Sequence, residues 1–345
     1  MDIEYKIGQM ILIGFKGYSL PEAIKNQIEN GFVSGVNLHD YDRGENKFEQ
    51  NIKSFEQLSL LINEIRSTVS EIPLFIGISQ EGGMASRLKK DYGFEQIDSA
   101  KKIGNRNDVE YSYKEYFKMA LELKKLGFNL NLAPVVDINT NLKNPVISLK
   151  DRSFSSSSNK VSKHSEQFIK AHNDLNILTS VKHFPGHGSS NVDSHLGFVD
   201  ITESWSEDEL IPYEYLINNN RIDMIMTSHV FNKNLDDKYP ATLSKNILKG
   251  MLRNRLAFDG VIISDNIEMK ALSENYSFEE IVLRGIEAGI DIFTITNSYY
   301  YDENIAIKFR NLILKKLKEG VISEERIDES YKRIMKLKKK YGIIS

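Results

Sequence analysis

The run Gly260-Val261-Ile262-Ile263-Ser264, followed directly by Asp265, is the clearest signal of fold in the chain. Its apolar residues are continuous rather than alternating, which is typical of a strand that is buried on both faces. Seven further runs rich in β-branched residues resemble it, and each is followed by a longer segment with helical periodicity. In chain order the eight runs are residues 9–15, 32–38, 74–79, 129–136, 178–184, 222–228, 260–264 and 290–296.

Eight strands that alternate with helices predict an α/β fold of the (β/α)₈ TIM-barrel type, formed by residues 1–345 as a single domain. No linker rich in Pro and Gly separates two halves. A doubly wound open sheet is the alternative, because the number of strands does not prove that the sheet closes. Between the runs, Ser244 is a possible N-cap, residues 279–288 have a helical pattern, and the serine-rich residues 153–158 predict a loop that leads to a capped helix.

The composition is that of an ordinary globular protein, with 41% hydrophobic and 27% charged residues and a formal net charge of −3. This charge gives no overall basic field that would attract nucleic acid or an anionic membrane. Residues 332–340 are locally rich in lysine, but Ile334, Leu337 and Tyr341 have helical spacing, so we expect a solvated basic face on a packed terminal helix.

The zero cysteine count excludes disulfides, thiolate metal sites and cysteine nucleophiles. No apolar run approaches the roughly 20 residues that span a bilayer. Residues 1–6 lack the pattern of a secretion signal and lead into a strand-like segment, which predicts a cytoplasmic location, or a periplasmic or secreted one if the chain has been trimmed. The sequence gives no indication of the oligomeric state.

Polar and titratable residues cluster at the C-terminal ends of successive runs. In a barrel of this type the loops after the strands converge at one face, where the active site lies. We therefore predict one shared pocket formed by Ser79, Gln80, Glu81, Asp137, Lys182, His183, His187, His229 and Asp265.

The densest group is Lys182-His183-Phe184-Pro185-Gly186-His187-Gly188, followed by Asp193-Ser194-His195. Three histidines within thirteen residues suggest zinc ligands, namely His183, His187 and His195. The spacing is not the helical one of known zinc motifs, and Asp193 is the one nearby carboxylate that could support a ligand, so no metal and no cofactor is expected. The other alternative is that these histidines are only hydrogen-bonded within a loop.

Asp265 directly follows a buried strand, so its carboxylate is predicted at the mouth of the barrel, where it could attack an electrophile. The alternative is that it caps the next helix, a position to which Asp is well suited. The histidine loop elsewhere in the chain favours the nucleophile.

Further motifs extend along nearly the whole chain. They are Ile7-Gly8-Gln9-Met10, Gln80-Glu81-Gly82-Gly83, Ala133-Pro134-Val135-Val136-Asp137, Asn144-Pro145-Val146-Ile147, Arg152-Ser153-Phe154, Pro240-Ala241-Thr242-Leu243-Ser244 and the segment from Phe258 to Asp265. Together with the histidine-rich group, they resemble glycoside hydrolase family 3, and in particular its single-domain bacterial β-N-acetylglucosaminidases, which act in peptidoglycan recycling.

The resemblance implies that Asp265 is the nucleophile and that His195, beside Asp193, is the proton donor. It also implies sugar contacts for Arg87, Arg152, Lys182 and His183, and we add Ser79 and His229 as candidate binding residues. Two positions depart from the family pattern, because Ser79 replaces a hydroxyl-binding aspartate and Met84 replaces an arginine.

These residues predict a retaining β-glycosidase, most specifically an exo-acting β-N-acetylglucosaminidase for cell-wall or chitin-derived oligosaccharides or glycopeptides. A neutral imidazole would not repel an anionic acceptor, so a β-glycoside phosphorylase is an alternative, as is a glycosidase for another sugar. The departures at Ser79 and Met84 motivate a third alternative, a sugar-binding protein without turnover.

Overall fold

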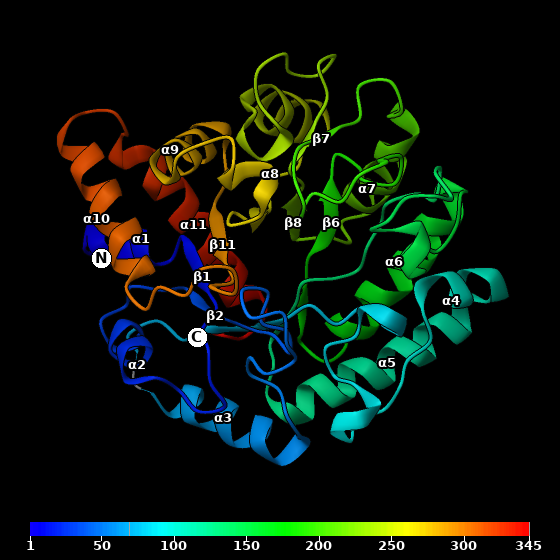
Figure 1. Ribbon diagram of the computed structural model, residues 1–345, viewed down its shortest axis with the longest axis horizontal. Helices are drawn as coiled ribbons and strands as arrows, with labels where there is room; N and C mark the ends of the chain where they lie inside the picture. The colour runs from blue at the N-terminus through cyan, green and yellow to red at the C-terminus, as the bar shows by residue number, and fades with distance from the viewer. Residues whose placement is uncertain (69, 345) are drawn as a thin grey trace.

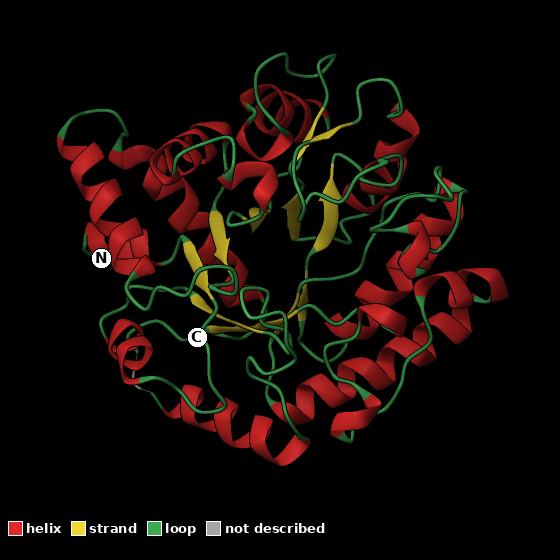
Figure 2. Cartoon of the chain, viewed as in Figure 1, coloured by secondary structure: helices red, strands yellow, loops and turns green. Residues whose placement is uncertain are grey.

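The computed structural model describes residues 1–68 and 70–344, and in Figures 1 and 2 a ring of strands lies inside a layer of helices. All nine strands of the ring run parallel, in the order β5-β4-β3-β2-β1-β11-β10-β8-β6. Their bounds are β1 (Ile11–Ile13), β2 (Gly35–Leu38), β3 (Phe75–Ile78), β4 (Leu130–Asn131), β5 (Leu178–Thr179), β6 (Val181–Phe184), β8 (Met224–Thr227), β10 (Val261–Asn266) and β11 (Ile292–Ile295).

The sheet closes through the predicted run 178–184. This run is divided into β5 and β6, which only Ser180 separates, and β5 pairs with β4 while β6 pairs with β8. The two ends of the strand order are therefore consecutive pieces of one strand. The prediction of a (β/α)₈-type barrel is confirmed, and the open doubly wound sheet is wrong.

Helices cover the outside of the ring, as the red ribbons of Figure 2 show. They are α1 (Ile3–Gly8), α2 (Glu22–Glu29), α3 (Phe55–Ser67), α4 (Ala100–Arg106), α5 (Val109–Leu126), α6 (Ser158–Asn173), α7 (Ile211–Asn218), α8 (Lys270–Ser273), α9 (Phe278–Ala288), α10 (Ile305–Lys318) and α11 (Glu324–Lys340), with a wide π-type helix at Asn246–Arg255. A small second sheet pairs β7 (Val199–Asp200) with β9 (Val230–Phe231).

Local capping explains several helix boundaries. Ser277 and Glu280 form a reciprocal capping box at the start of α9, which contains the predicted helical segment 279–288. The Ser244 hydroxyl accepts a hydrogen bond from the Ile247 amide at 3.0 Å, as its prediction as an N-cap requires. Residues 153–157 form the expected loop before α6, but the Ser157 side chain makes no capping bond.

The strand-like segment predicted after residues 1–6 is β1, and it follows the short helix α1, which the Asp2 side chain caps. Two local predictions were wrong. The strand expected at 129–136 is only two residues long, since Pro134 lacks the N–H that a longer ladder needs. Strand β10 extends to Asn266, so Asp265 lies within the last residues of the strand rather than after it.

The lower end of the barrel, formed by the N-terminal ends of the strands, is closed by α11. Ile334 and Leu337 of this helix belong to the same apolar cluster as Leu12, Phe75 and other side chains that fill the ring. Lys338 is fully buried there, so the prediction of a solvated basic face fails for this residue.

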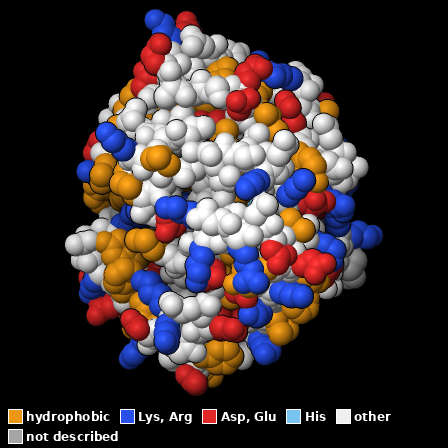
Figure 3. All heavy atoms as spheres, turned by 90° about the vertical axis from the view of Figure 1, so that its right-hand side faces the viewer, with side chains coloured by type: hydrophobic (Ala, Val, Ile, Leu, Met, Phe, Trp, Pro, Cys, Tyr) orange, Lys and Arg blue, Asp and Glu red, His pale blue; other side chains and the backbone are white. Residues whose placement is uncertain are grey.

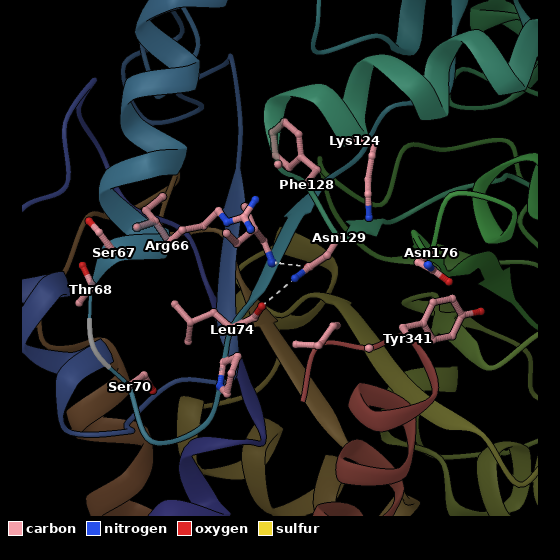
Figure 4. A pocket seen from close by; sticks show the side chains of 16 residues that line it. Arg66, Ser67, Thr68, Ser70, Leu74, Lys124, Phe128, Asn129, Asn176 and Tyr341 are labelled. Atoms are coloured by element: carbon pink, nitrogen blue, oxygen red, sulfur yellow. Dashed lines mark hydrogen bonds between the residues drawn. The ribbon is translucent and has the colours of Figure 1, made fainter. Parts of the chain in front are cut away.

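Two cavities lie at opposite ends of the barrel. The larger, of about 520 Å³, lies at the lower end beside β3 and β4 (Figure 4), and Arg66 and Lys124 are the charged side chains among the described residues that line it. The Asn129 amide in this cavity is engaged with the backbone of Leu74 and Ile76. Because the described lining contains no Asp, Glu or His, acid–base chemistry has no basis there, and the smaller cavity at the upper end is the candidate site.

The outer surface shows no field of one sign on the face drawn in Figure 3, where blue and red side chains are interspersed. In the part of the chain that the structure describes, no helix combines the length and the apolar character needed to cross a membrane.

Candidate active site

A cavity of about 290 Å³ opens at the C-terminal ends of the strands. Its lining comes from the ends of β2, β3, β6, β8, β10 and β11 and from the loops that follow the strands, as the barrel geometry requires. Of the nine residues predicted to be catalytic or to bind the sugar, seven line it: Ser79, Arg87, Arg152, Lys182, His183, His195 and Asp265. The other two, Asp193 and His229, are not part of the lining. Glu81 and His187 of the predicted pocket also line it, whereas Gln80 and Asp137 do not.

Asp265 presents an ionised carboxylate to this cavity. Its Oδ1 accepts a hydrogen bond from the Asn266 amide at 2.7 Å. Burial alone would raise the pKa of Asp265, but His229, His183 and His195 outweigh it and lower the pKa to about 2. The helix that follows, α8, begins at Lys270 with Met269 at its N-cap, so the alternative of Asp265 as a helix cap is wrong.

His229 supports the nucleophile strand from behind. Its Nε2 lies 2.9 Å from the Asn266 carbonyl oxygen, so this nitrogen must carry the hydrogen, and Nδ1 lies 2.8 Å from the Thr242 hydroxyl. Both ring nitrogens are thus engaged with the protein. The structure therefore places His229 to position Asn266 and its neighbour Asp265, and not among the residues that line the cavity.

His195 and Asp193 form a dyad at the rim. Asp193 Oδ1 accepts from the ring Nδ1 of His195 at 2.7 Å and from its amide at 2.9 Å. A carboxylate can only accept here, so Nδ1 carries the hydrogen and Nε2 is left for another partner. Burial and the charge of Arg43 lower the pKa of His195 against the opposing effect of Asp193. Burial raises the pKa of Asp193, but the two hydrogen bonds and the charge of His195, together with the charge of Lys150, outweigh it and hold the pKa of that carboxyl below its usual range.

Glu81 organises two of the predicted sugar-binding cations. Its carboxylate accepts from Arg152 Nε at 2.7 Å and Nη2 at 2.8 Å, and it pairs with Lys182 Nζ at 2.7 Å. Lys182 also donates to Ser79 Oγ at 2.6 Å and to the Leu132 carbonyl at 2.5 Å. Because these donors are directed at the protein, contacts of Arg152 and Lys182 with a sugar stay predictions. Glu81 was foreseen as part of the pocket but not in this role.

Asp137 holds the segment that contains His183 and His187, as Glu81 holds Arg152 and Lys182. It accepts from His183 Nδ1 at 2.7 Å and from the His187 amide at 2.8 Å. The His187 ring contacts the hydroxyls of Ser190 at 2.7 Å and Ser194 at 3.2 Å, and burial with the nearby His183 lowers its pKa to about 4. The three histidines of the zinc alternative thus have three different partners. Among residues 1–68 and 70–344, no three His, Asp or Glu side chains are grouped as metal ligands.

The loop that carries the dyad is anchored where it leaves β6. Buried Glu209 accepts from the Gly188 amide at 3.0 Å, and the Trp205 indole donates to the Pro185 carbonyl at 3.1 Å. Asn144 donates to the His187 carbonyl at 2.7 Å. Burial and the charge of Asp137 raise the pKa of Glu209 to about 8, so this anchor is protonated at neutral pH.

Several lining residues were missed from the sequence: Asn37, His39, Tyr41, Arg43 and Lys150. Arg87 reaches the cavity beside them, with Nη1 3.3 Å from the buried carboxylate of Asp40. His39 and Asp40 directly follow the run 32–38, so the rule that polar residues follow strands could have found them. Arg43 and Lys150 lie further along their loops, where the sequence carries no such signal.

The site thus combines an ionised carboxylate with an imidazole that a second carboxylate orients. This is the set of groups needed for covalent catalysis with a separate acid and base. Comparison with known proteins places these groups in a family. Residues 2–337 match the family model described as the glycosyl hydrolase family 3 N terminal domain.

Curated relatives and solved structures agree. A beta-hexosaminidase of Photobacterium profundum is 34% identical over 84% of this chain and 82% of its own length, and beta-hexosaminidase A of Pseudoalteromonas piscicida is 30% identical over 97% of this chain and 60% of its own. A family 3 β-N-acetylglucosaminidase from Paenibacillus sp. str. FPU-7 superimposes with a TM-score of 0.90 at 31% identity, covering 99% of this chain and 63% of that structure. Since the family model and the relatives cover most of the chain, this protein belongs to glycosyl hydrolase family 3.

Proposed function

We propose that the protein is a retaining β-N-acetylglucosaminidase that removes a terminal β-linked N-acetylglucosamine from oligosaccharides. Family membership and the β-hexosaminidase relatives support a glycoside hydrolase of the β-N-acetylhexosaminidase type. The observation that carries the proposal is that Asp265, ionised, and the His195–Asp193 dyad meet at one cavity.

In the first step, Asp265 attacks the anomeric carbon while protonated His195 donates its Nε2 proton to the departing oxygen. The bond between sugar and aglycone breaks, and a covalent glycosyl-enzyme forms. Asp193 holds Nδ1–H and favours the protonated ring as it develops charge. In the second step neutral His195 takes a proton from water, whose oxygen bonds to the anomeric carbon as the bond to Asp265 breaks. This step frees the Asp265 carboxylate and restores the β configuration.

Two alternatives keep the same residues. In a phosphorylase, an inorganic phosphate takes the place of water in the second step. In a sugar-binding protein without turnover, the departures at Ser79 and Met84 would have removed activity. The presence of both the Asp265 carboxylate and the His195–Asp193 dyad weighs against a sugar-binding protein without turnover.

The experiment is to follow hydrolysis of p-nitrophenyl β-N-acetylglucosaminide and to record by NMR the anomer that forms first. Initial release of the β anomer is the expected result, and initial release of the α anomer would contradict the covalent mechanism. The absence of turnover on this and other β-glycosides would favour the binding protein. Release of sugar 1-phosphate in the presence of phosphate would favour the phosphorylase.

Peptidoglycan fragments, including glycopeptides, or chitin fragments are the proposed natural substrates, and a cytoplasmic location is part of the proposal. Turnover of purified muropeptides and of chitin oligosaccharides, together with cell fractionation, tests these points.

A further inference from the structure

The segment of residues 191–198, which carries the dyad, lies largely at the surface. Within this segment, which the structure describes in full, Ser194 is the one buried side chain, with 3% exposure. It lies between the two members of the dyad, Asp193 and His195, which are half-buried, and Leu196 just beyond them is 72% exposed. The position of the dyad at the rim of the cavity therefore depends on the contacts that hold Ser194.

Two contacts hold Ser194 in place. Its hydroxyl lies 3.2 Å from Nε2 of His187, a residue of the turn that follows β6. Its carbonyl oxygen accepts a hydrogen bond from the Ala271 amide at 3.3 Å, and Ala271 lies on α8, the helix that follows Asp265. Ser194 thus joins the segment of the proton donor to the histidine turn and to the segment of the nucleophile.

The bonds of Ser190 determine which ring nitrogen of His187 carries the hydrogen. The Ser190 hydroxyl donates to the His187 carbonyl at 3.1 Å and lies 2.7 Å from His187 Nδ1. Because its one hydrogen is used in the first bond, its oxygen accepts from Nδ1–H, and Nε2 keeps a lone pair that accepts from the Ser194 hydroxyl. Burial and the nearby His183 lower the pKa of His187 to about 4, so the ring is neutral at neutral pH, as this arrangement requires.

The backbone of His187 is held on both sides of its α-carbon. Its amide donates to Asp137 Oδ1 at 2.8 Å, and its carbonyl accepts from Asn144 Nδ2 at 2.7 Å. The side chain lines the cavity and is only 2% exposed. Since both ring nitrogens are engaged with serine hydroxyls, the ring has no free donor or acceptor for a sugar.

We propose that His187 is a positioning residue of the glycosidase, which fixes the dyad at the rim of the cavity through its bond to Ser194, so that His195 Nε2 reaches the departing oxygen. The inference rests on the proposed function, which makes His195 the proton donor. In this role His187 touches neither the substrate nor the reacting atoms. It acts by holding the donor, and a misplacement of about 1 Å can lower a rate on the order of 10²-fold.

The test separates the two ring nitrogens of His187 by substitution. The amide of Asn lies near the position of Nδ1, and the amide of Gln lies near that of Nε2. His187→Asn therefore keeps a partner for Ser190 and loses the bond to Ser194, whereas His187→Gln keeps a partner for Ser194. Each variant is assayed on a β-linked N-acetylglucosamine disaccharide and on the nitrophenyl glycoside. The measured quantity is the ratio of the two kcat/KM values, because the disaccharide depends far more on the proton donor.

We expect the ratio of disaccharide to nitrophenyl glycoside to fall by about 10-fold to 100-fold in His187→Asn and in Ser194→Ala, and to stay within about threefold of the wild type in His187→Gln. The double variant His187→Asn/Ser194→Ala should lose no more than the larger single loss, because both changes remove the same bond. His164→Asn is the matched control, because His164 is equally buried and contacts the Ser112 hydroxyl at 2.7 Å, but lies on α6 away from the cavity. Its ratio should equal that of the wild type.

A purely structural role of His187 gives a different result. If His187→Asn lowers kcat/KM on both substrates by the same factor, together with the midpoint of thermal unfolding, the positioning role is overturned while the glycosidase stands. If His187→Asn does not fold, Ser194→Ala decides, because it removes the same bond from the other partner. An unchanged ratio in Ser194→Ala overturns the inference.

If the wild type turns over neither substrate, the proposed function fails, and an NMR titration of the His195 ring decides the positioning role separately. Burial and the charge of Arg43 lower the pKa of His195, against the opposing effects of Asp193 and Asp265. Release of the dyad from the rim exposes the ring, so the pKa of His195 should rise towards 6.5 in Ser194→Ala. An equal pKa of His195 in the wild type and in Ser194→Ala overturns the inference.

Discussion

The barrel buries a lysine near each end, and the two lie in different electrostatic surroundings. Lys182, at the upper end, pairs with the carboxylate of Glu81 at 2.7 Å. Lys338, at the lower end, donates to three neutral acceptors, Gln9 Oε1 at 2.8 Å, the Ser34 carbonyl at 3.0 Å and the Pro73 carbonyl at 2.8 Å. Burial lowers the pKa of both lysines, but Glu81 opposes the effect only at Lys182.

The different surroundings of Lys182 and Lys338 indicate different roles for the two ends of the barrel. At the lower end, Lys338 serves as a hydrogen-bond donor that satisfies carbonyl groups under α11, and it can do so as a neutral amine. At the upper end, Lys182, Glu81 and Arg152 are held by one another around an open cavity, which is an arrangement suited to a ligand. Substitutions at the upper end should therefore change rates, and those at the lower end should change stability.

The largest effect is expected for Asp265→Asn. The amide cannot form the glycosyl-enzyme, so kcat should fall by at least about 10³-fold, while the midpoint of thermal unfolding stays close to that of the wild type. Asp259→Asn is the matched control, because Asp259 is an exposed carboxylate two residues before the start of the same strand. More than a few percent residual activity would show that Asp265 is not the nucleophile.

His195→Ala should show an effect that depends on the leaving group. A sugar alkoxide needs a proton as it leaves, so kcat/KM on a disaccharide should fall on the order of 10²-fold to 10⁴-fold, with a much smaller loss on a nitrophenyl glycoside. Because the pKa of His195 is lowered from 6.5, the wild-type kcat/KM on the disaccharide should decline as the pH rises from that lowered pKa towards neutrality.

His164→Ala serves as the control for this variant, since His164 lies on α6 and contacts the Ser112 hydroxyl at 2.7 Å, away from the cavity. Equal losses on both substrates for His195→Ala would point to a binding role. The proton donor would then have to be sought elsewhere at the rim.

Lys182→Met and Lys338→Met test the comparison directly. Lys182→Met removes the donor to Ser79 Oγ and one of the two cations that hold the Glu81 carboxylate at the cavity, so kcat/KM should fall by about 10-fold to 100-fold. Lys338→Met should leave kcat/KM unchanged, because Lys338 lies at the opposite end of the barrel.

The stability effect of Lys338→Met should depend on pH. In the wild type the folded state binds fewer protons than the unfolded state below the ordinary lysine pKa of 10.5, so wild-type stability contains a contribution that grows as the pH rises. The free energy of unfolding of the wild type minus that of the variant should therefore increase as the pH rises towards 10.5, by up to about 1.4 kcal/mol per pH unit. Urea unfolding at several pH values measures it, and a constant difference would mean that Lys338 keeps its proton on folding.

Glu209→Gln tests the anchor of the dyad loop, because it changes the charge of the side chain without changing its shape. The folded pKa of about 8 lies above the ordinary 4.5, so the stabilising contribution of protonated Glu209 is complete below about pH 4.5 and is lost as the pH rises through 8. Relative to the variant, the wild type should lose stability over that interval. Glu203→Gln, at an exposed carboxylate nearby, is the control, and parallel pH profiles for wild type and Glu209→Gln would contradict the prediction.

The sequence by itself determined the architecture and the reacting groups. Strands buried on both faces require continuous apolar runs, and parallel strands bring their C-terminal ends together, so the positions of Lys182, His183 and Asp265 followed from local pattern. The short separation of Asp193 and His195 likewise allowed their pairing to be anticipated.

The tertiary structure decided which charges are satisfied and which are free. The sheet closes because the two parts of the run 178–184 pair with different strands, β5 with β4 and β6 with β8. This division depends on the pairing register, which composition does not determine. In the sequence, nothing distinguishes Lys338 from the exposed lysines beside it. It is buried because α11 packs against the lower end of the ring of strands. Arg43 and Lys150 carry no local signal, because whether a surface cation faces a carboxylate or a cavity depends on how loops far apart in the chain converge.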